Sequence, residues 1–395
     1  MIVERWQEKL KIDLKKTETK PMIKLLLLLI PFFKPDIVVS FPKINIIFYG
    51  YLLVSLIIII FTYIKGNYIS KFSLIYICYY IITLFSTLIN DGNLLKMNVD
   101  SLQNLGIILL IEMNLKGNKE CFFKSLSFIF WILTIMNTIS IFMFPNGIKI
   151  TDITNTPIYL LGIDNRFAFV YLPGLCVITL KDMITKNKIT FYTILYLAIT
   201  YFTFIYFWSA GALLAETLLI IFYFIIFKTK IKINPKNFLL YDLIAFFGIV
   251  IFRMQNIFKY LIVDILKKDL TLSSRTLLWD KAINIIKDNY LIGIGVQKYT
   301  YILEKISAYH AHSYFLNIIL QSGLVGFVLF IILIYMSLNN LNKFKNNRCS
   351  KIIAFTIFTM LIMLLVDTFD ITCNMIMLLS LGYCVKEIVK ENENE

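Results

Sequence analysis

Long runs of apolar residues alternate with short polar segments along almost the whole chain. A helix that spans the hydrocarbon core of a bilayer needs roughly 20 mostly apolar residues. Twelve segments are predicted to be such helices: 22–41, 44–64, 72–90, 94–113, 122–144, 165–180, 189–208, 209–227, 238–257, 311–336, 352–367 and 371–385. The pattern therefore predicts an all-α polytopic membrane protein, with residues 1–395 forming a single transmembrane domain. The seventh and eighth segments are continuous, and Ser209-Ala210-Gly211 is the predicted turn between them.

The Lys and Arg residues gather on one side of the predicted helices. If the N-terminus is cytoplasmic, 25 of the 39 Lys and Arg residues lie in cytoplasmic segments and 14 lie outside. Nine of those 14 lie in one long loop or at the end of the predicted helix before it, and without these nine the contrast is 25 to 5. Because an excess of Lys and Arg marks the cytoplasmic loops of membrane proteins, both termini are predicted to be cytoplasmic.

The segment 258–310 is the only large polar stretch between the predicted helices. The orientation makes it a large extracytoplasmic loop. Apolar residues recur in it at helical spacing, with Leu278, Ala282 and Ile285 on one face. An amphipathic helix is therefore expected here, and Trp279 suits it to the membrane interface.

The composition excludes several other classes of protein. Hydrophobic residues make up 58% of the chain and charged residues only 16%, against about 25% in a typical soluble protein. The net charge of +14 lies in short clusters between apolar runs, which indicates membrane topology rather than a nucleic-acid surface. The six cysteines have no C-x-x-C spacing, so neither a disulfide framework nor a zinc site is predicted.

A series of short motifs runs from Leu272 to Tyr335. It contains an S-x-R, a Trp, a G-x-G, an Ala-His and two late glycines: Ser273, Arg275, Trp279, Gly293, Gly295, Ala311, His312, Gly323 and Gly326. This order resembles the O-antigen ligase and O-antigen polymerase (Wzy) superfamily over about 60 residues. The segment 162–169, which contains Arg166, resembles a second segment of that family. Gly293-Ile294-Gly295 lacks the third glycine and the strand of a nucleotide-binding loop and is predicted to be a tight turn.

The resemblance implies a glycosyltransferase in the bacterial cytoplasmic (inner) membrane that needs neither cofactor nor metal. A glycan on a polyprenyl diphosphate, such as undecaprenyl diphosphate, would move to a lipid-linked repeat unit on the outer face and extend a capsule or O-antigen. An O-antigen ligase, with the same donor and another acceptor, is the close alternative. The implied partners are lipid-linked oligosaccharides, the bilayer, a flippase and chain-length regulator proteins, with no nucleic acid.

A polysaccharide flippase or similar transporter is the alternative from another class. Transporters often contain internal repeats and charged or broken helices near the membrane midplane. The sequence shows no repeat, and its distinctive residues lie on one predicted side of the membrane. This arrangement favours an enzyme.

Two arginines and one lysine are candidates for binding the diphosphate. The leaving diphosphate gains negative charge, and Arg is always cationic and binds phosphate oxygens in a bidentate manner. Arg275 lies near the predicted start of a loop helix, whose dipole adds to its charge, and Arg166 lies at the outer start of the sixth helix. Lys281 would help to attract the headgroup. Each of the three is alternatively an ordinary charge at the membrane surface.

The chain has two histidines, His310 and His312, at the outer entrance of the tenth helix. An unperturbed imidazole has a pKa near 6.5 and accepts a hydroxyl proton at neutral pH. The motif favours His312 as the general base. In a helix the two side chains would point to different faces, so His310 is expected to be a lesser, substrate-binding residue. Either is alternatively a hydrogen-bonding residue of the interface.

Three acidic residues complete the set of candidates. Glu216 lies inside the eighth helix, where it either assists the substrate site or forms a hydrogen bond between helices. Asp367 and Asp370 lie at the outer end of the eleventh helix and either bind sugar hydroxyls or belong to a solvated loop. Trp279 is a further candidate for a substrate contact.

Overall fold

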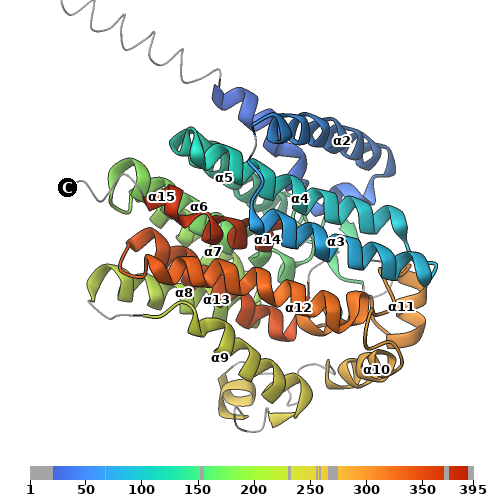
Figure 1. Cartoon of the computed structure of the whole chain (residues 1–395). Coiled ribbons are helices and arrows are strands. Elements are labelled where there is room, and N and C mark those ends of the chain that lie inside the picture. Colours follow the sequence, from blue (N-terminus) through green and yellow to red (C-terminus); the bar gives the residue numbers. More distant parts are fainter. Residues whose placement is uncertain are drawn as a thin grey trace, which may run out of the picture.

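A computed structural model describes residues 21–66, 68–151, 155–229, 233–254, 257, 259–265, 275–368 and 373–389, which are almost wholly helical (Figure 1). The first apolar helix, Pro21–Phe33, leads into a 3₁₀ segment, Asp36–Ser40. Seven helices follow: α2 (Pro42–Lys65), α3 (Lys71–Ile89), α4 (Leu94–Lys116), α5 (Lys119–Met143), α6 (Ala168–Lys186), α7 (Phe191–Phe207) and α8 (Ala210–Lys228). Between α5 and α6, the short strands β1 (Lys149–Ile150) and β2 (Pro157–Ile158) pair antiparallel, and the 3₁₀ turn η3 (Asp164–Arg166) follows them.

The second half of the chain is also helical. Its elements are α9 (Asn237–Ala245), the π-helices η4 (Phe246–Ile251) and η6 (Tyr260–Ile265), α10 (Arg275–Asp288), α11 (Tyr299–Ile306), α12 (Tyr314–Lys343), α13 (Arg348–Val366), α14 (Cys373–Tyr383) and α15 (Val385–Val389). The α-helix α9 continues directly into η4.

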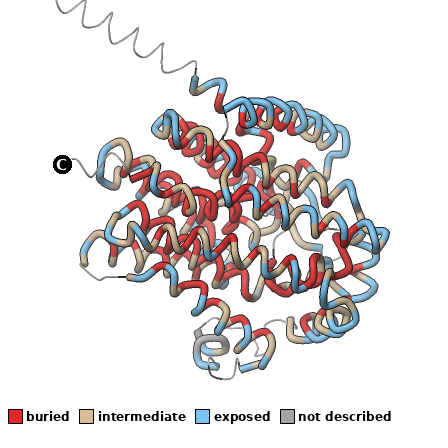
Figure 2. The backbone as a smooth tube through the Cα atoms, in the orientation of Figure 1, coloured by how far each residue is buried: buried red, intermediate tan, exposed pale blue. Residues whose placement is uncertain are grey.

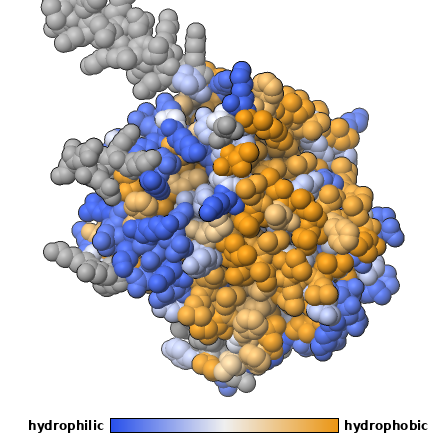
Figure 3. Space-filling view, in the orientation of Figure 1, coloured by the Kyte–Doolittle hydropathy of each residue, from blue (hydrophilic) through white to orange (hydrophobic). Residues whose placement is uncertain are grey.

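Each of the twelve predicted segments contains a helix. Among the described residues, eight helices are long and apolar enough to cross a membrane. The four shorter apolar helices are Pro21–Phe33, Phe191–Phe207, Asn237–Ile251 and Cys373–Tyr383. Figure 3 shows that hydrophobic residues cover most of one face of the molecule, with hydrophilic residues gathered toward its ends. The all-α polytopic membrane fold predicted from the sequence is confirmed.

The turn between the seventh and eighth helices lies close to its predicted place. Trp208 ends α7 in the left-handed conformation, with φ of 48°, and Ser209 precedes α8. Ala210 and Gly211 already belong to α8, so the turn lies one to two residues before the predicted one.

The helices form one bundle whose centre is α6 and α13. Of the eight longer spans, these two are the most buried, whereas α2 is the least buried and lies at the edge (Figure 2). The helix α12 packs against α3, α10, α13 and α14. Two buried hydroxyls inside the bundle are satisfied within their own helices: Thr179 donates to the carbonyl of Leu175, and Thr356 to that of Ile352. Because such a hydroxyl donates to a carbonyl of its own helix, an apolar helix can contain it without leaving a polar atom unsatisfied.

The helix α10 buries the face that its spacing predicts. Ala282 is fully buried, Leu278 and Ile285 are half-buried against the core, and Lys281 and Asp288 are exposed. The same face carries Trp279, which is also fully buried, so α10 packs on α12 and does not present its Trp to the interface. The expectation of an interfacial Trp279 is therefore wrong.

The helix α12 is broken at Gly323, where φ is 62° and ψ is −170°. Residues 290–295 occupy the break. The backbone N–H groups of Ile294 and Gly295 donate to the carbonyls of Leu320 and Gln321, at 2.8 and 2.9 Å. A broken transmembrane helix exposes backbone groups that lipid cannot satisfy, and here the inserted segment satisfies them.

Glycines make this insertion possible. Gly293 and Gly295 both have φ of 73°, which confirms the predicted tight turn at the G-x-G motif. A Cβ atom at Gly323 would lie 2.1 Å from the carbonyl oxygen of Leu291, and one at Gly295 would lie 2.4 Å from the Cα of Thr87. The segment then continues to α4, where the N–H of Asn93 donates to the carbonyl of Val296 at 2.7 Å. Part of the predicted outer loop is thus built into the helix bundle.

Candidate active site

The two histidines lie in a non-helical segment between α11 and α12. In this segment Ala311 and Ser313 are fully buried, while His310 and His312 are half-exposed on the other side. The backbone of His312 is left-handed, with φ of 47°, a conformation that is uncommon for residues other than glycine. Local packing therefore holds His312 in a strained position, as is frequent at functional sites.

The expectation that the two histidines face apart is wrong. Their ring centroids are 4.2 Å apart, and the backbone N–H of His312 donates to Nδ1 of His310 at 3.3 Å. The expectation assumed a helix, whereas the segment is not helical and its bent, left-handed backbone at His312 brings both rings to the same side. Within the described part of the chain, no group of three or more His, Cys, Asp or Glu side chains is placed to hold a metal ion.

Asp367, at the end of α13, joins His312 to Arg275. Its Oδ1 lies 3.6 Å from Nδ1 of His312, and its Oδ2 lies 3.6 Å from Nη2 of Arg275. The same Oδ1 accepts the backbone N–H of Thr368 at 2.8 Å. The side chain of Asp367 is only 19% exposed, so it does not lie in a solvated loop. Asp370 lies outside the described residues.

Two opposing effects act on the Asp367 carboxyl. Burial alone would raise its pKa, but His312 and the Arg275 guanidinium outweigh burial and hold the pKa below its usual range. Asp367 is therefore ionised at neutral pH. It provides a fixed negative charge between a permanent cation and an imidazole that can gain a proton.

The helix α10 supplies Arg275 and the residue that positions His312. Arg275 is the first residue of α10, as expected, and its side chain is 21% exposed. One turn later, Nε1 of Trp279 donates to the backbone carbonyl of His312 at 3.2 Å. Trp279 is fully buried, so it stabilises the histidine segment and is not itself open to a ligand.

Sequence reasoning missed Arg253. Its guanidinium lies 4.8 Å from the centre of the Trp279 ring, forms an ion pair with Asp280, and donates to the carbonyl of Thr276 at 3.0 Å. It thus holds the first turns of α10 from the end of η4. No motif surrounds Arg253, and its one signal is that a cation interrupts the end of the ninth apolar run.

The structure places Arg166 in a different ion pair. Its Nη1 lies 2.7 Å from Oδ2 of Asp36, and Arg166 is the last residue of η3. Nearby, the side-chain amide of Asn374 in α14 donates to the carbonyl of Phe169 at 2.8 Å. Because α14 follows the Asp367 segment, Arg166 and Asp367 lie at the same end of the bundle.

Lys281 and Glu216 have structural partners. Nζ of Lys281 donates to Oγ of Ser307 at 2.7 Å, which ties α10 to the start of the histidine segment. Glu216 is 1% exposed in α8 and accepts a hydrogen bond from Thr200 of α7 at 2.5 Å. This contact matches the alternative interpretation of Glu216 as a hydrogen bond between helices.

A polar cavity begins two residues after His312. It lies between α3, α4 and α12, and Tyr79, Asn317 and Gln321 are among the residues that line it. Lys96 and Asp100, which form an ion pair at 3.0 Å, line the α4 side. Aromatic rings, amides and an ion pair are groups that bind sugar rings and hydroxyls.

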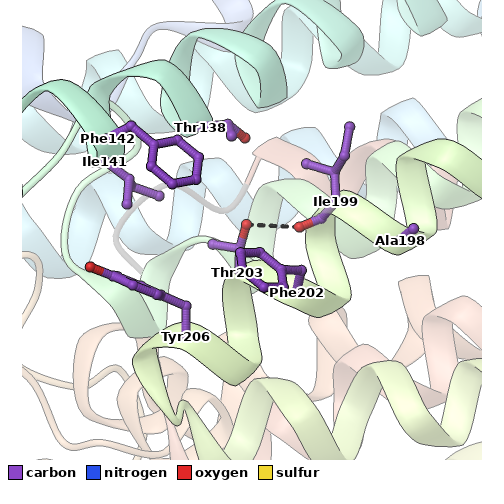
Figure 4. Close-up of a pocket in the computed structure, with 8 residues that line it drawn as sticks. All are labelled: Thr138, Ile141, Phe142, Ala198, Ile199, Phe202, Thr203 and Tyr206. Carbon is purple, nitrogen blue, oxygen red and sulfur yellow. Dashed lines mark hydrogen bonds between the residues drawn. The ribbon is translucent and has the colours of Figure 1, made fainter.

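An apolar groove lies between α5 and α7. Figure 4 shows its lining, in which Ile141 and Phe142 of α5 face Ile199, Phe202 and Tyr206 of α7. The groove has a volume of about 290 Å³, and its walls are almost entirely carbon. Such a groove suits a hydrocarbon chain.

Comparison with known families identifies one match. Residues 193–331 match the family described as O-antigen ligase, and this segment includes Arg275, Trp279 and His312. The superfamily resemblance of the motifs is therefore confirmed. Neither the curated proteins nor the solved structures gave a match.

Proposed function

We propose, from the match of residues 193–331 to the family described as O-antigen ligase, that the chain is a polymerase of a bacterial surface polysaccharide. The family implies a glycosyl-transferring membrane enzyme of the ligase or polymerase type. The proposed donor is a glycan on polyprenyl diphosphate, and the proposed acceptor is a lipid-linked repeat unit at the outer face of the cytoplasmic membrane.

In the proposed reaction, His312 removes the proton of the acceptor hydroxyl. The hydroxyl oxygen bonds to the anomeric carbon of the donor as the bond from that carbon to the diphosphate oxygen breaks. The diphosphate leaves with the bonding electrons, and Arg275 stabilises its charge. The proton stays on His312, and Asp367 stabilises the resulting imidazolium, as the carboxylate does in other His–Asp pairs.

The observation that supports this proposal most is that Arg275 and His312 both lie 3.6 Å from Asp367. A base and a phosphate-binding cation are thereby fixed close to each other, as transfer between two bound substrates requires. Nδ1 of His312 faces Asp367, so Nε2 is the atom assigned to accept the proton. The proposal requires no metal, and EDTA should leave the rate unchanged.

The polar cavity and the apolar groove suit the two parts of the substrates. The polar cavity after His312 would hold sugars, and the apolar groove between α5 and α7 would hold part of a polyprenyl chain. Arg166 is proposed as a second cation for the diphosphate, in which case it must release or share Asp36.

The glycan that a deletion strain accumulates tests the proposal. Single repeat units on the final acceptor would support a polymerase. Full-length chains left on the carrier lipid would instead identify an O-antigen ligase, which is the description that the family carries. Repeat units trapped at the cytoplasmic face would identify a flippase and contradict both.

A further inference from the structure

A second, basic cavity lies at the other end of the helices that form the polar cavity. It is bounded by the start of α3 and the ends of α4, α12 and α14, and its volume is about 680 Å³. Four lysines line it: Lys71, Lys116, Lys343 and Lys386. These residues are separated by as many as 315 positions in the sequence, so only the fold brings them together.

The four lysines outnumber the acids of the cavity, which are Glu112 and Glu387. In the part of the chain that the structure describes, none of the four ammonium groups forms an ion pair with a carboxylate. Lys116 lies 5.4 Å from the centre of the Tyr68 ring, and Lys343 donates to Oδ1 of Asn340 at 3.0 Å. This excess of positive charge raises the potential of the cavity and favours an anionic ligand.

The cavity has a polar floor that is already occupied by internal contacts. Glu112 is 3% exposed and accepts hydrogen bonds from Ser70 and Tyr63, both at 2.5 Å. Ser70 also caps α3 by accepting the N–H of Ser73, and the start of this 19-residue helix faces the cavity. These contacts therefore fix the helix end, whose dipole adds positive potential to the cavity.

The rim of the cavity is apolar and aromatic. Tyr68, Ile69, Phe344 and Tyr383 line it beside the lysines. A free inorganic anion needs no such rim, whereas a phospholipid presents a phosphodiester directly beside its acyl chains. We propose that this cavity binds the headgroup of an anionic phospholipid, with the phosphate between the lysines and the upper acyl chains along the aromatic rim.

The predicted orientation is consistent with this site. The four helix ends lie on the side predicted to be cytoplasmic, where anionic lipids attract basic residues. Lysines that only fix topology need no shared cavity, and others at the same end, such as Lys186 and Lys228, do not line it. The site does not depend on the proposed glycosyl transfer, so it can be tested by binding alone.

The test uses the full-length purified protein and native mass spectrometry with phosphatidylglycerol or phosphatidylcholine. Phosphatidylglycerol is expected to stay bound at least about tenfold more strongly than phosphatidylcholine. Replacing Lys71, Lys116, Lys343 and Lys386 together by Gln should abolish this preference. The quadruple Arg variant keeps the charges and should retain it.

A matched control removes four lysines from the same end. Gln at Lys186, Lys188, Lys228 and Lys236 changes the net charge equally and should leave the preference intact. Equal loss in both variants, or equal binding of the two lipids to the wild type, would refute the site. Competition by inorganic phosphate at the concentration of the lipid would assign the cavity to a free anion and overturn the lipid assignment.

Discussion

The helices α3, α4, α12 and α14 form a group, and its two ends differ in whether their charged side chains are paired. At the end near His312, three cations form ion pairs with acids: Arg275 with Asp367, Lys96 with Asp100 and Arg166 with Asp36. At the other end, four lysines and two glutamates line one cavity, and among the described residues none of these lysines forms an ion pair. The same helices thus carry a site of paired charges and a site of unpaired charges.

This difference matches two kinds of chemistry. A reaction that moves a proton needs groups held at fixed distances, and paired charges hold one another in place. With Asp367 ionised, proton uptake by His312 makes the cluster more positive as the leaving diphosphate becomes negative. A site that only attracts an anion needs net charge more than fixed geometry, and unpaired lysines supply it.

The comparison requires the two ends to lie on opposite sides of the membrane. Single cysteines at Asn289, the residue after α10, and at Asn346, between α12 and α13, test this in a Cys-free background. An impermeant reagent applied to intact cells should label Asn289→Cys and leave Asn346→Cys unlabelled. Labelling in the reverse pattern would place the basic cavity outside and the histidines inside.

His312→Ala should cause the largest loss of activity, because it removes the proposed base. General-base assistance is worth about 100- to 10,000-fold in rate. The rate of polymer formation from purified lipid-linked repeat units measures this loss, and binding of the lipid donor should persist. Since the His310 ring is only 4.2 Å away, His310→Ala is the matched control and should lose less. A reversed order of severity would transfer the role to His310.

Arg275→Ala should lower the rate by about 30- to 1,000-fold, which corresponds to roughly 2–4 kcal/mol of lost charge stabilisation. Arg275→Lys keeps the charge but loses the bidentate fork, and its rate should fall between those of Ala and wild type. Arg253→Lys makes the same change at another arginine that contacts α10, so its rate provides a comparison for that of Arg275→Lys. Full-length polymer from a normal amount of Arg275→Ala protein would contradict the assignment of Arg275 to the leaving diphosphate.

The hydrophobic pattern predicted the fold because each helix is specified by its own residues. Each of the twelve apolar runs contains a helix, and only the lengths of these helices had to come from the structure. The motif order also selected Arg275 and His312 as candidates, and the structure places both beside Asp367. The break of α12 was not predicted, because a glycine inside an apolar run looks the same whether or not another segment enters there.

The rest of the site depends on contacts between distant residues. Asp367 is 55 positions from His312, and no local pattern shows that the end of α13 reaches the histidine segment. The histidine geometry was mispredicted because α12 begins at Tyr314, two residues after His312, and not at the predicted position 311. Helix boundaries are easily misplaced by one or two residues. Here the later start of α12 leaves both histidines outside the helix, so their side chains are neighbours and do not point to different faces.

Asp367→Asn tests whether the pairing of Asp367 with His312 affects the proton transfer. Without the anion, the imidazolium that forms during the reaction loses stabilisation, so the rate should fall by about tenfold. In the wild type the lowered pKa of Asp367 means that its stabilising effect is complete above about pH 4 and disappears as pH falls through that lowered value. An unchanged rate in the variant would show that Asp367 does not act on the base.

Trp279→Phe should give the smallest effect and define how α10 serves the site. The variant keeps most of the buried ring but removes the Nε1–H bond to the His312 carbonyl, worth about 0.5–1.5 kcal/mol, so the rate should fall by about 2- to 12-fold. If Trp279 acts only by placing the imidazole, the same change in a His312→Ala background should cost almost nothing further, because there is no imidazole left to place. A full additional loss in the double variant would mean that Trp279 affects the reaction by another route, with Arg275, one turn away on α10, as the nearest candidate.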